Sequence, residues 1–300
     1  MRIVIQVNCV RKRLGALLIL LLFPLLLTAQ SQDTTQLSQR YLPGAHVEIY
    51  KRIDGADLRI SLVYPPDYKP GTLYPGMVFF FGGGWRRGRV TQFEPECRYF
   101  ANRGMVTMSV DYRVESRQGT TPFESVKDAR SAMRWIRIHA QRLGVQAGRI
   151  VAAGGSAGGH LALATALLDR VNEAGEDTSV STLPAAPVLY NPVAKTTQGG
   201  YGYERLKERA SELSPVEHVR PGIPPVIVFH GEGDTTVPIE NIEELYNKIK
   251  QAGGICEFHR FPDQKHGFYK PANEEVYSGI VQLTDRFLVE QGFLIPQPDK

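Results

Sequence analysis

A serine between glycines is the first feature of this chain that could carry out chemistry. Ser156 lies in the segment G-G-S-A-G (154–158), after a short apolar run (149–153) and before a small-residue run typical of a helix (157–168). The pattern G-x-S-x-G at a strand-to-helix junction predicts a sharp, strained turn that exposes the hydroxyl and tolerates only small neighbours. Ser156 is therefore the predicted nucleophile, and the alternative is a glycine-rich phosphate-binding or packing turn.

Asp234 and His266 are the residues that could activate this serine. A serine hydroxyl is a weak nucleophile until a histidine takes its proton, and a carboxylate holds that histidine. With this kind of turn the chain order is serine, then Asp or Glu, then histidine. Asp234 and His266 satisfy this order, and each follows a predicted strand (226–230 and 255–261). We therefore expect Ser156, Asp234 and His266 to meet as a catalytic triad.

Other acids and histidines are weaker candidates for these roles. Glu232 is close enough to Asp234 to replace it, whereas Asp263 is expected to belong to a turn. His230 ends a predicted strand and His160 opens the helix after the serine, so we expect local contacts for both. The remaining histidines have no catalytic context: His46, His139, His218 and His259.

A run of glycines provides the second part of the predicted site. Gly82, Gly83 and Gly84 follow the apolar run 77–81, and glycine lets a backbone approach a substrate closely. A tetrahedral intermediate requires N–H groups directed at its oxyanion, one of them from the residue after the nucleophile. We predict an oxyanion hole from the backbone of Gly83, Gly84 and Ala157, and the alternative is an ordinary glycine turn.

The segments that must position these groups alternate between strand-like and helix-like patterns. A predicted hairpin comes first, with strands in 46–51 and 58–64 and a turn at Asp54-Gly55. Further strands are expected within 77–81, 105–112, 149–153, 187–190, 226–230 and 255–261, and helices within 93–103, 123–142, 157–168, 239–252 and 274–291. This order predicts an α/β fold with a mostly parallel central sheet, an N-terminal antiparallel hairpin and helices on both faces.

One α/β domain is predicted over residues 45–293, after a flexible segment over 31–44. Segment 195–225 interrupts the alternation and is polar, so we expect it to form a small cap or lid over the sheet edge. The alternative is an excursion that makes no contact with substrate.

The first thirty residues (1–30) have the pattern of a signal peptide. Basic residues 11–13 precede an apolar run (14–27) that is shorter than the roughly 20 residues of a membrane span. We expect cleavage and export to the periplasm or the medium, with no stable membrane insertion afterwards. The alternative is an uncleaved anchor.

Charge and cysteine content narrow the classes of partner. The net charge of +4 equals the contribution of four basic residues within the first thirty, so the rest is neutral and lacks the electrostatic footprint of a nucleic-acid-binding protein. No CxxC motif or Cys/His cluster suggests a metal, and no cofactor is expected. Cys97 and Cys256 could form a disulfide after export or stay free and buried.

Four motifs together resemble the α/β-hydrolase esterases of the BD-FAE and hormone-sensitive-lipase-like branches. They are F-G-G-G-W (81–85), G-G-S-A-G-G-H-L-A (154–162), H-G-E-G-D-T-T-V-P (230–238) and K-H-G-F (265–268). The resemblance covers residues 45–290. It implies an α/β-hydrolase fold and hydrolysis of short carboxylic esters, such as acetyl or feruloyl esters of a small molecule or carbohydrate, through an acyl-enzyme.

Other functions remain open for a chain with these motifs. An exported peptidase or amidase, prolyl-oligopeptidase-like or arylformamidase-like, would use the same triad and is the main alternative. A non-catalytic binding protein on the same scaffold would lack part of the triad or the glycine loop, and this chain lacks neither.

The chain departs from these relatives at two positions. Many relatives have histidine at the position of Phe81, where it braces the glycine loop, so we expect packing to replace it here. Lipase-like relatives often have an acidic residue at the position of Gly155. This second departure favours the BD-FAE branch.

Overall fold

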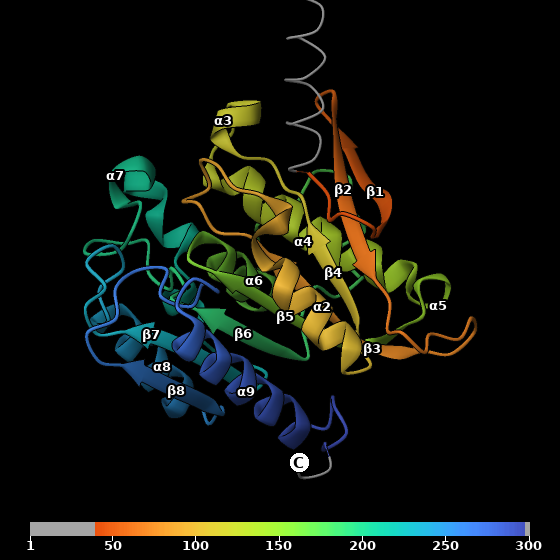
Figure 1. The fold of residues 1–300 in the computed structure, drawn as a ribbon. Coiled ribbons are helices and arrows are strands. Elements are labelled where there is room, and N and C mark those ends of the chain that lie inside the picture. The colour runs from red at the N-terminus through yellow and green to blue at the C-terminus, as the bar shows by residue number, and fades with distance from the viewer. Residues whose placement is uncertain (1–39, 298–300) are drawn as a thin grey trace, which may run out of the picture. The chain divides into compact units, whose positions relative to one another are not determined.

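The computed structural model describes residues 40–297, which form an eight-stranded sheet covered by helices (Figure 1). The strands are β1 (His46–Ile53), β2 (Ala56–Val63), β3 (Tyr74–Phe80), β4 (Val106–Val110), β5 (Val145–Gly155), β6 (Ala186–Tyr190), β7 (Val226–Gly231) and β8 (Cys256–Phe261). The α-helices are α2 (Glu94–Asn102), α3 (Glu115–Gln118), α4 (Pro122–Ile138), α5 (Ala140–Leu143), α6 (Ala157–Leu167), α7 (Tyr203–Leu206), α8 (Glu240–Gln251) and α9 (Glu274–Glu290). The 3-10 helices are η1 (Val90–Phe93), η2 (Lys207–Leu213) and η3 (Pro215–His218).

The sheet has the strand order β1-β2-β4-β3-β5-β6-β7-β8. β1 and β2 form the predicted hairpin, and Asp54 and Gly55 at its turn have φ angles of 49° and 73°. Positive φ at both positions is what a tight hairpin turn requires. β2 also runs antiparallel to β4, whereas the pairings from β4 to β8 are parallel. The predicted α/β fold with a mostly parallel sheet is confirmed.

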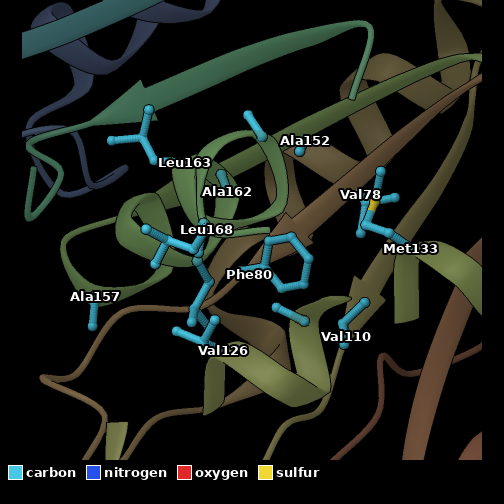
Figure 2. Close-up of a cluster of buried hydrophobic side chains, with 14 of the residues drawn as sticks. Val78, Phe80, Val110, Val126, Met133, Ala152, Ala157, Ala162, Leu163 and Leu168 are labelled. Carbon is cyan, nitrogen blue, oxygen red and sulfur yellow. The ribbon is translucent and has the colours of Figure 1, made fainter. Parts of the chain in front are cut away.

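Alternate side chains of the central strands build a separate core on each face of the sheet. In β3, Met77 and Phe79 pack under α2 and α9, and Val78 and Phe80 pack under α4 and α6. Figure 2 shows the second cluster, where Val78 and Phe80 lie beside residues of α4 and α6. Each such buried side chain contributes about 1.5–3 kcal/mol. The two cores therefore fix the carboxyl ends of the strands, where the site residues lie.

The packed part of the chain extends past two of the predicted boundaries. Residues 1–39 lie outside the described residues, so the signal peptide (1–30) stays a prediction. The end of the segment predicted as flexible (31–44) is packed, because Leu42 is fully buried and its N–H donates to Ser61 Oγ at 2.9 Å. At the other end Leu294, one residue beyond the predicted limit, is also buried.

The helix predicted over 123–142 is interrupted at His139, which separates α4 from α5. His139 has φ −101° and ψ 10°, and its Nδ1 lies 2.8 Å from the Trp135 carbonyl oxygen, so the ring caps the end of α4.

Within residues 40–297, no helix has both the length and the apolar character needed to cross a membrane.

The two described cysteines are free thiols on opposite faces of the sheet. Cys97 belongs to the core under α2, and Cys256 to the core under α8. Burial raises the pKa of Cys97 well above its ordinary value and that of Cys256 to about 12. Of the two alternatives open from the sequence, the structure has the buried free thiols.

Glu96 of α2 is a buried carboxyl group whose Oε2 has no hydrogen-bond partner in residues 40–297. Burial raises its pKa to about 8, against 4.5 for a free side chain. Between these values the folded protein holds a proton that the unfolded chain has lost. The contribution of Glu96 to the free energy of unfolding therefore falls as the pH rises from 4.5 to 8.

Glu96→Gln should remove this pH dependence, because the amide does not titrate. At pH 5 the variant should be close to the parent protein, and at pH 8 it should be more stable by roughly 4 kcal/mol. Urea unfolding of both proteins at the two pH values measures this, with the half-buried neighbour Glu94→Gln as the control. Parallel pH dependence of the parent and Glu96→Gln would contradict the assignment.

Candidate active site

Ser156 lies at the turn between β5 and α6 and has φ 54° and ψ −120°, a strained conformation for a residue other than glycine. Its N–H donates to the Tyr190 carbonyl oxygen at 2.9 Å, and its own carbonyl accepts from the N–H groups of His160 (3.0 Å) and Val193 (3.1 Å). A Cβ at Gly158 would lie 2.0 Å from the Phe80 carbonyl oxygen. The predicted strand–turn–helix geometry is therefore present, and only glycine fits at 158.

The structure brings Ser156, Asp234 and His266 together from three separate loops. The Ser156 Oγ lies 2.9 Å from His266 Nε2, and His266 Nδ1 lies 2.6 Å from Asp234 Oδ2. A carboxylate can only accept, so Nδ1 carries the proton and Nε2 accepts from the serine hydroxyl. This is the arrangement in which a histidine can take the serine proton.

Asp234 is held as an anion by its surroundings. Burial raises its pKa, but the hydrogen bonds from His266 and from the N–H groups of Thr236 and Val237 (both 2.9 Å) outweigh burial, and the pKa lies below its usual value. Glu232, the alternative acid, instead pairs with the exposed Arg260 at 2.9 Å. The geometry therefore favours Asp234 as the partner of His266.

His230 and His160 make the local contacts expected of them. His230 is fully buried and donates from Nε2 to the Val237 carbonyl oxygen at 2.9 Å, which fixes the turn that carries Asp234. His160 donates from Nε2 to the Leu213 carbonyl oxygen at 2.6 Å, and burial lowers its pKa to about 4. His160 therefore connects α6 to η2, in segment 195–225, and does not contact the serine hydroxyl.

The N–H groups of the three predicted oxyanion donors, Gly83, Gly84 and Ala157, make no hydrogen bond within residues 40–297. Gly83 and Gly84 have φ angles of 133° and 65°, and a Cβ at Gly83 would lie 2.0 Å from the Arg87 carbonyl oxygen. The sharp turn after β3 therefore requires glycine at 83.

The glycine loop is braced by packing, as expected, and by hydrogen bonds that the sequence did not predict. Phe81 does stack on Tyr112, with ring centroids 4.0 Å apart. In addition Tyr112 donates its hydroxyl to the Phe81 carbonyl at 2.6 Å, and Gln92 Oε1 accepts from the Gly82 N–H at 2.7 Å. No local sequence pattern marks Gln92 or Tyr112 for this role.

Segment 195–225, predicted as a cap, also contacts the glycine loop. Arg205 of α7 donates to the Gly84 carbonyl oxygen at 2.9 Å and pairs with Glu115 at 2.9 Å. The Tyr201 hydroxyl lies so close to Gly84 that a Cβ there would be 2.4 Å from it. The segment therefore lies at the predicted site, and its role as a lid stays a prediction.

Asn191, directly after β6, is a further residue that the sequence did not single out. Its Oδ1 accepts from the N–H of Gly267 at 3.0 Å, and Gly267 is the neighbour of His266. Asn191 is fully buried with φ 35°. Asn191 therefore fixes the loop that carries His266.

No group of His, Cys, Asp and Glu side chains that could hold a metal occurs in the part of the chain that the structure describes.

Gly155 shows why an acidic residue is absent before the nucleophile. A Cβ at this position would lie 2.2 Å from the hydroxyl of Tyr269, which is buried.

We expect Gly155→Asp to lower the free energy of unfolding by about 1–3 kcal/mol through overpacking, and further through a buried charge. Chemical denaturation measures this against Gly148→Asp in the same strand, where an added Cβ meets nothing within 4 Å. Equal stability of the two variants would contradict it.

The strand order, the strained serine turn and the Ser–His–Asp contacts define an α/β-hydrolase. The BD-FAE family model matches residues 62–188. The chain is 32% identical over 237 residues to carboxylesterase NlhH of Mycobacterium tuberculosis, covering 71% of each chain. The structure matches the apo form of Thermogutta terrifontis esterase 2 with a TM-score of 0.82 and 45% identity, over 85% of this chain and 98% of that one.

The chain therefore belongs to the α/β-hydrolase esterases, as its motifs predicted. Some relatives are much longer. Esterase LipC of Mycobacterium tuberculosis is 26% identical over 215 residues, which are 65% of this chain and 53% of LipC. The chain spans about half the length of this relative.

Proposed function

We propose that this chain hydrolyses carboxylic esters with short acyl groups through an acyl-enzyme on Ser156. The observation that carries the proposal is the contact between Ser156 Oγ and His266 Nε2 at 2.9 Å, with His266 held by Asp234 at 2.6 Å. The glycine loop lies next to the nucleophile, since a Cβ at Gly82 would be 3.4 Å from Ser156 Cβ. The N–H groups of Gly83, Gly84 and Ala157, which have no acceptor among residues 40–297, are the proposed oxyanion donors. These are the parts that acyl transfer requires.

The steps follow from this geometry. His266 takes the proton of Ser156 as the oxygen attacks the ester carbonyl, and the oxyanion accepts hydrogen bonds from Gly83, Gly84 and Ala157. The imidazolium is stabilised by the Asp234 carboxylate and gives its proton to the leaving alkoxide. A water molecule then attacks the acyl-enzyme while His266 takes its proton. The carboxylic acid is released, and His266 returns the proton to Ser156 Oγ.

The size of the acyl group is proposed from the structural relative named above. The Thermogutta esterase has been solved with propionate and with butyrate bound. We extend this to acetyl- to butyryl-sized groups for the present chain. The alcohol is proposed to be a small molecule or a carbohydrate, as in acetyl esters of sugars, because the predicted signal peptide would place the enzyme outside the cytoplasm.

An assay on p-nitrophenyl esters of rising acyl length tests this proposal. We expect turnover of the acetyl to butyryl esters and a decline for longer chains. A folded protein that hydrolyses none of them would contradict the proposal. If it instead cleaved aminoacyl p-nitroanilides or aryl formamides, the peptidase or amidase alternative would replace the esterase.

A further inference from the structure

We propose that Gln92 is a positioning residue that fixes the glycine loop for oxyanion binding and couples it to the loop that carries His266. The inference rests on the proposed function, because it assigns a role in that reaction. Gln92 lies in η1, ten residues after Gly82 in the chain. Its carboxamide reaches two groups that belong to different parts of the site.

The orientation of the Gln92 side chain is determined by its partners. The backbone N–H of Gly82 can only donate, so the atom 2.7 Å from it is the carbonyl oxygen Oε1. The amide nitrogen Nε2 therefore faces the hydroxyl of Tyr269, to which it donates at 2.7 Å. One planar group thus connects the glycine loop to Tyr269.

The peptide unit between Phe81 and Gly82 is held at both of its polar ends. Tyr112 donates to its carbonyl oxygen at 2.6 Å, and Gln92 accepts from its N–H at 2.7 Å. With this unit fixed, the loop cannot rotate without breaking a hydrogen bond. The Gly82 N–H is used in this contact, and the N–H groups of Gly83 and Gly84 remain for substrate.

Tyr269 transmits the contact to the rest of the site. It is 3% exposed, its ring stacks on Phe93 (centroids 5.8 Å apart, 8° between planes), and its hydroxyl lies over Gly155. It is also three residues after His266. Gln92 braces the glycine loop next to Phe81, and Tyr269 occupies the space beside Gly155. Phe81 and Gly155 are the two positions where this chain departs from the relatives that its motifs resemble.

Replacement of Gln92 by methionine tests the proposal, because methionine keeps the length of the side chain and removes both hydrogen bonds. Loss of one oxyanion donor costs about 10²–10³ in rate. Loss of a group that only positions two donors should cost less, and we expect kcat on p-nitrophenyl butyrate to fall about 10–30-fold with KM within about twofold. The matched control is Gln146→Met, which removes one hydrogen bond, to the Leu73 carbonyl oxygen.

The second readout is inhibition by a trifluoromethyl ketone, which forms a tetrahedral oxyanion on the serine. If Gln92 positions the loop, the inhibition constant should rise in parallel with the loss of kcat/KM. Gln146→Met should change neither quantity. A variant Gln92→Met with parent-like kcat and inhibition, or with losses equal to those of Gln146→Met, would overturn the proposal.

Tyr269→Phe removes a single oxygen and decides the question if Gln92→Met does not fold. We expect about a threefold loss of kcat, and in Gln92→Met/Tyr269→Phe a loss smaller than the product of the two single effects, because both act through one contact. Parent-like kcat in Tyr269→Phe would overturn the proposal.

The assays also separate this inference from the proposed function. A parent protein without ester turnover would overturn the proposed function as well, whereas an active parent with an unaffected Gln92→Met would overturn this inference alone.

Discussion

Ser156→Ala should lower kcat/KM for p-nitrophenyl acetate and butyrate by about 10⁴-fold or more, with the fold unchanged. Alanine cannot form the acyl-enzyme, and what remains is the small rate supported by the oxyanion donors. The strained backbone at 156 is set by Tyr190, His160 and Val193 and not by the serine side chain, so the variant should unfold at nearly the same denaturant concentration.

The comparison for this variant is the exposed Ser116→Ala, which should be indistinguishable from the parent. Steady-state kinetics of the three purified proteins give the answer. Equal activity of Ser156→Ala and the parent would show that a different group is the nucleophile.

Asp234→Asn should lower kcat by about 10³–10⁴-fold with little change in KM. The amide cannot stabilise an imidazolium, and its NH₂ group can donate to Nδ1 and so favour the tautomer in which Nε2 carries the proton. His266 would then be unable to accept from Ser156. The effect should be large because Asp234 Oδ2 is buried and lies 2.6 Å from His266 Nδ1.

Glu232→Gln is the matched comparison for Asp234→Asn, because it changes the neighbouring acid that the sequence left as an alternative. Glu232 pairs with Arg260 at the surface, where an ion pair is worth about 0–1 kcal/mol. We expect its kcat to stay within about twofold of the parent value. Loss of activity in Glu232→Gln with full activity in Asp234→Asn would reverse the assignment of the acid.

The sequence was sufficient to predict the sheet and the position of the nucleophile, because both depend on local patterns. A buried parallel strand is a short apolar run, and a strained serine turn requires glycine on either side. The chain order of Ser156, Asp234 and His266 then predicted that their side chains lie in contact, and in the structure they do. Their roles in catalysis stay predictions until the variants above are measured.

What the sequence could not predict depends on contacts between distant residues. The contact of Gln92 with Tyr269 joins positions 177 residues apart, and no local pattern marks either residue. The same holds for Leu42, whose burial depends on Ser61 and the core under α2. The sequence shows that glycine at 155 departs from lipase-like relatives. The physical reason is the Tyr269 hydroxyl, which leaves no space for a side chain there, and this contact is known only from the structure.

Covalent trapping of the nucleophile tests the central claim most directly. The parent protein and Ser156→Ala are treated with the organophosphate paraoxon, and the site of labelling is located by mass spectrometry of peptides. The account predicts one diethylphosphoryl group, on Ser156, with loss of ester turnover in proportion to labelling and no label in Ser156→Ala. A label on another residue that abolishes turnover, or full labelling of Ser156 with turnover intact, would contradict it.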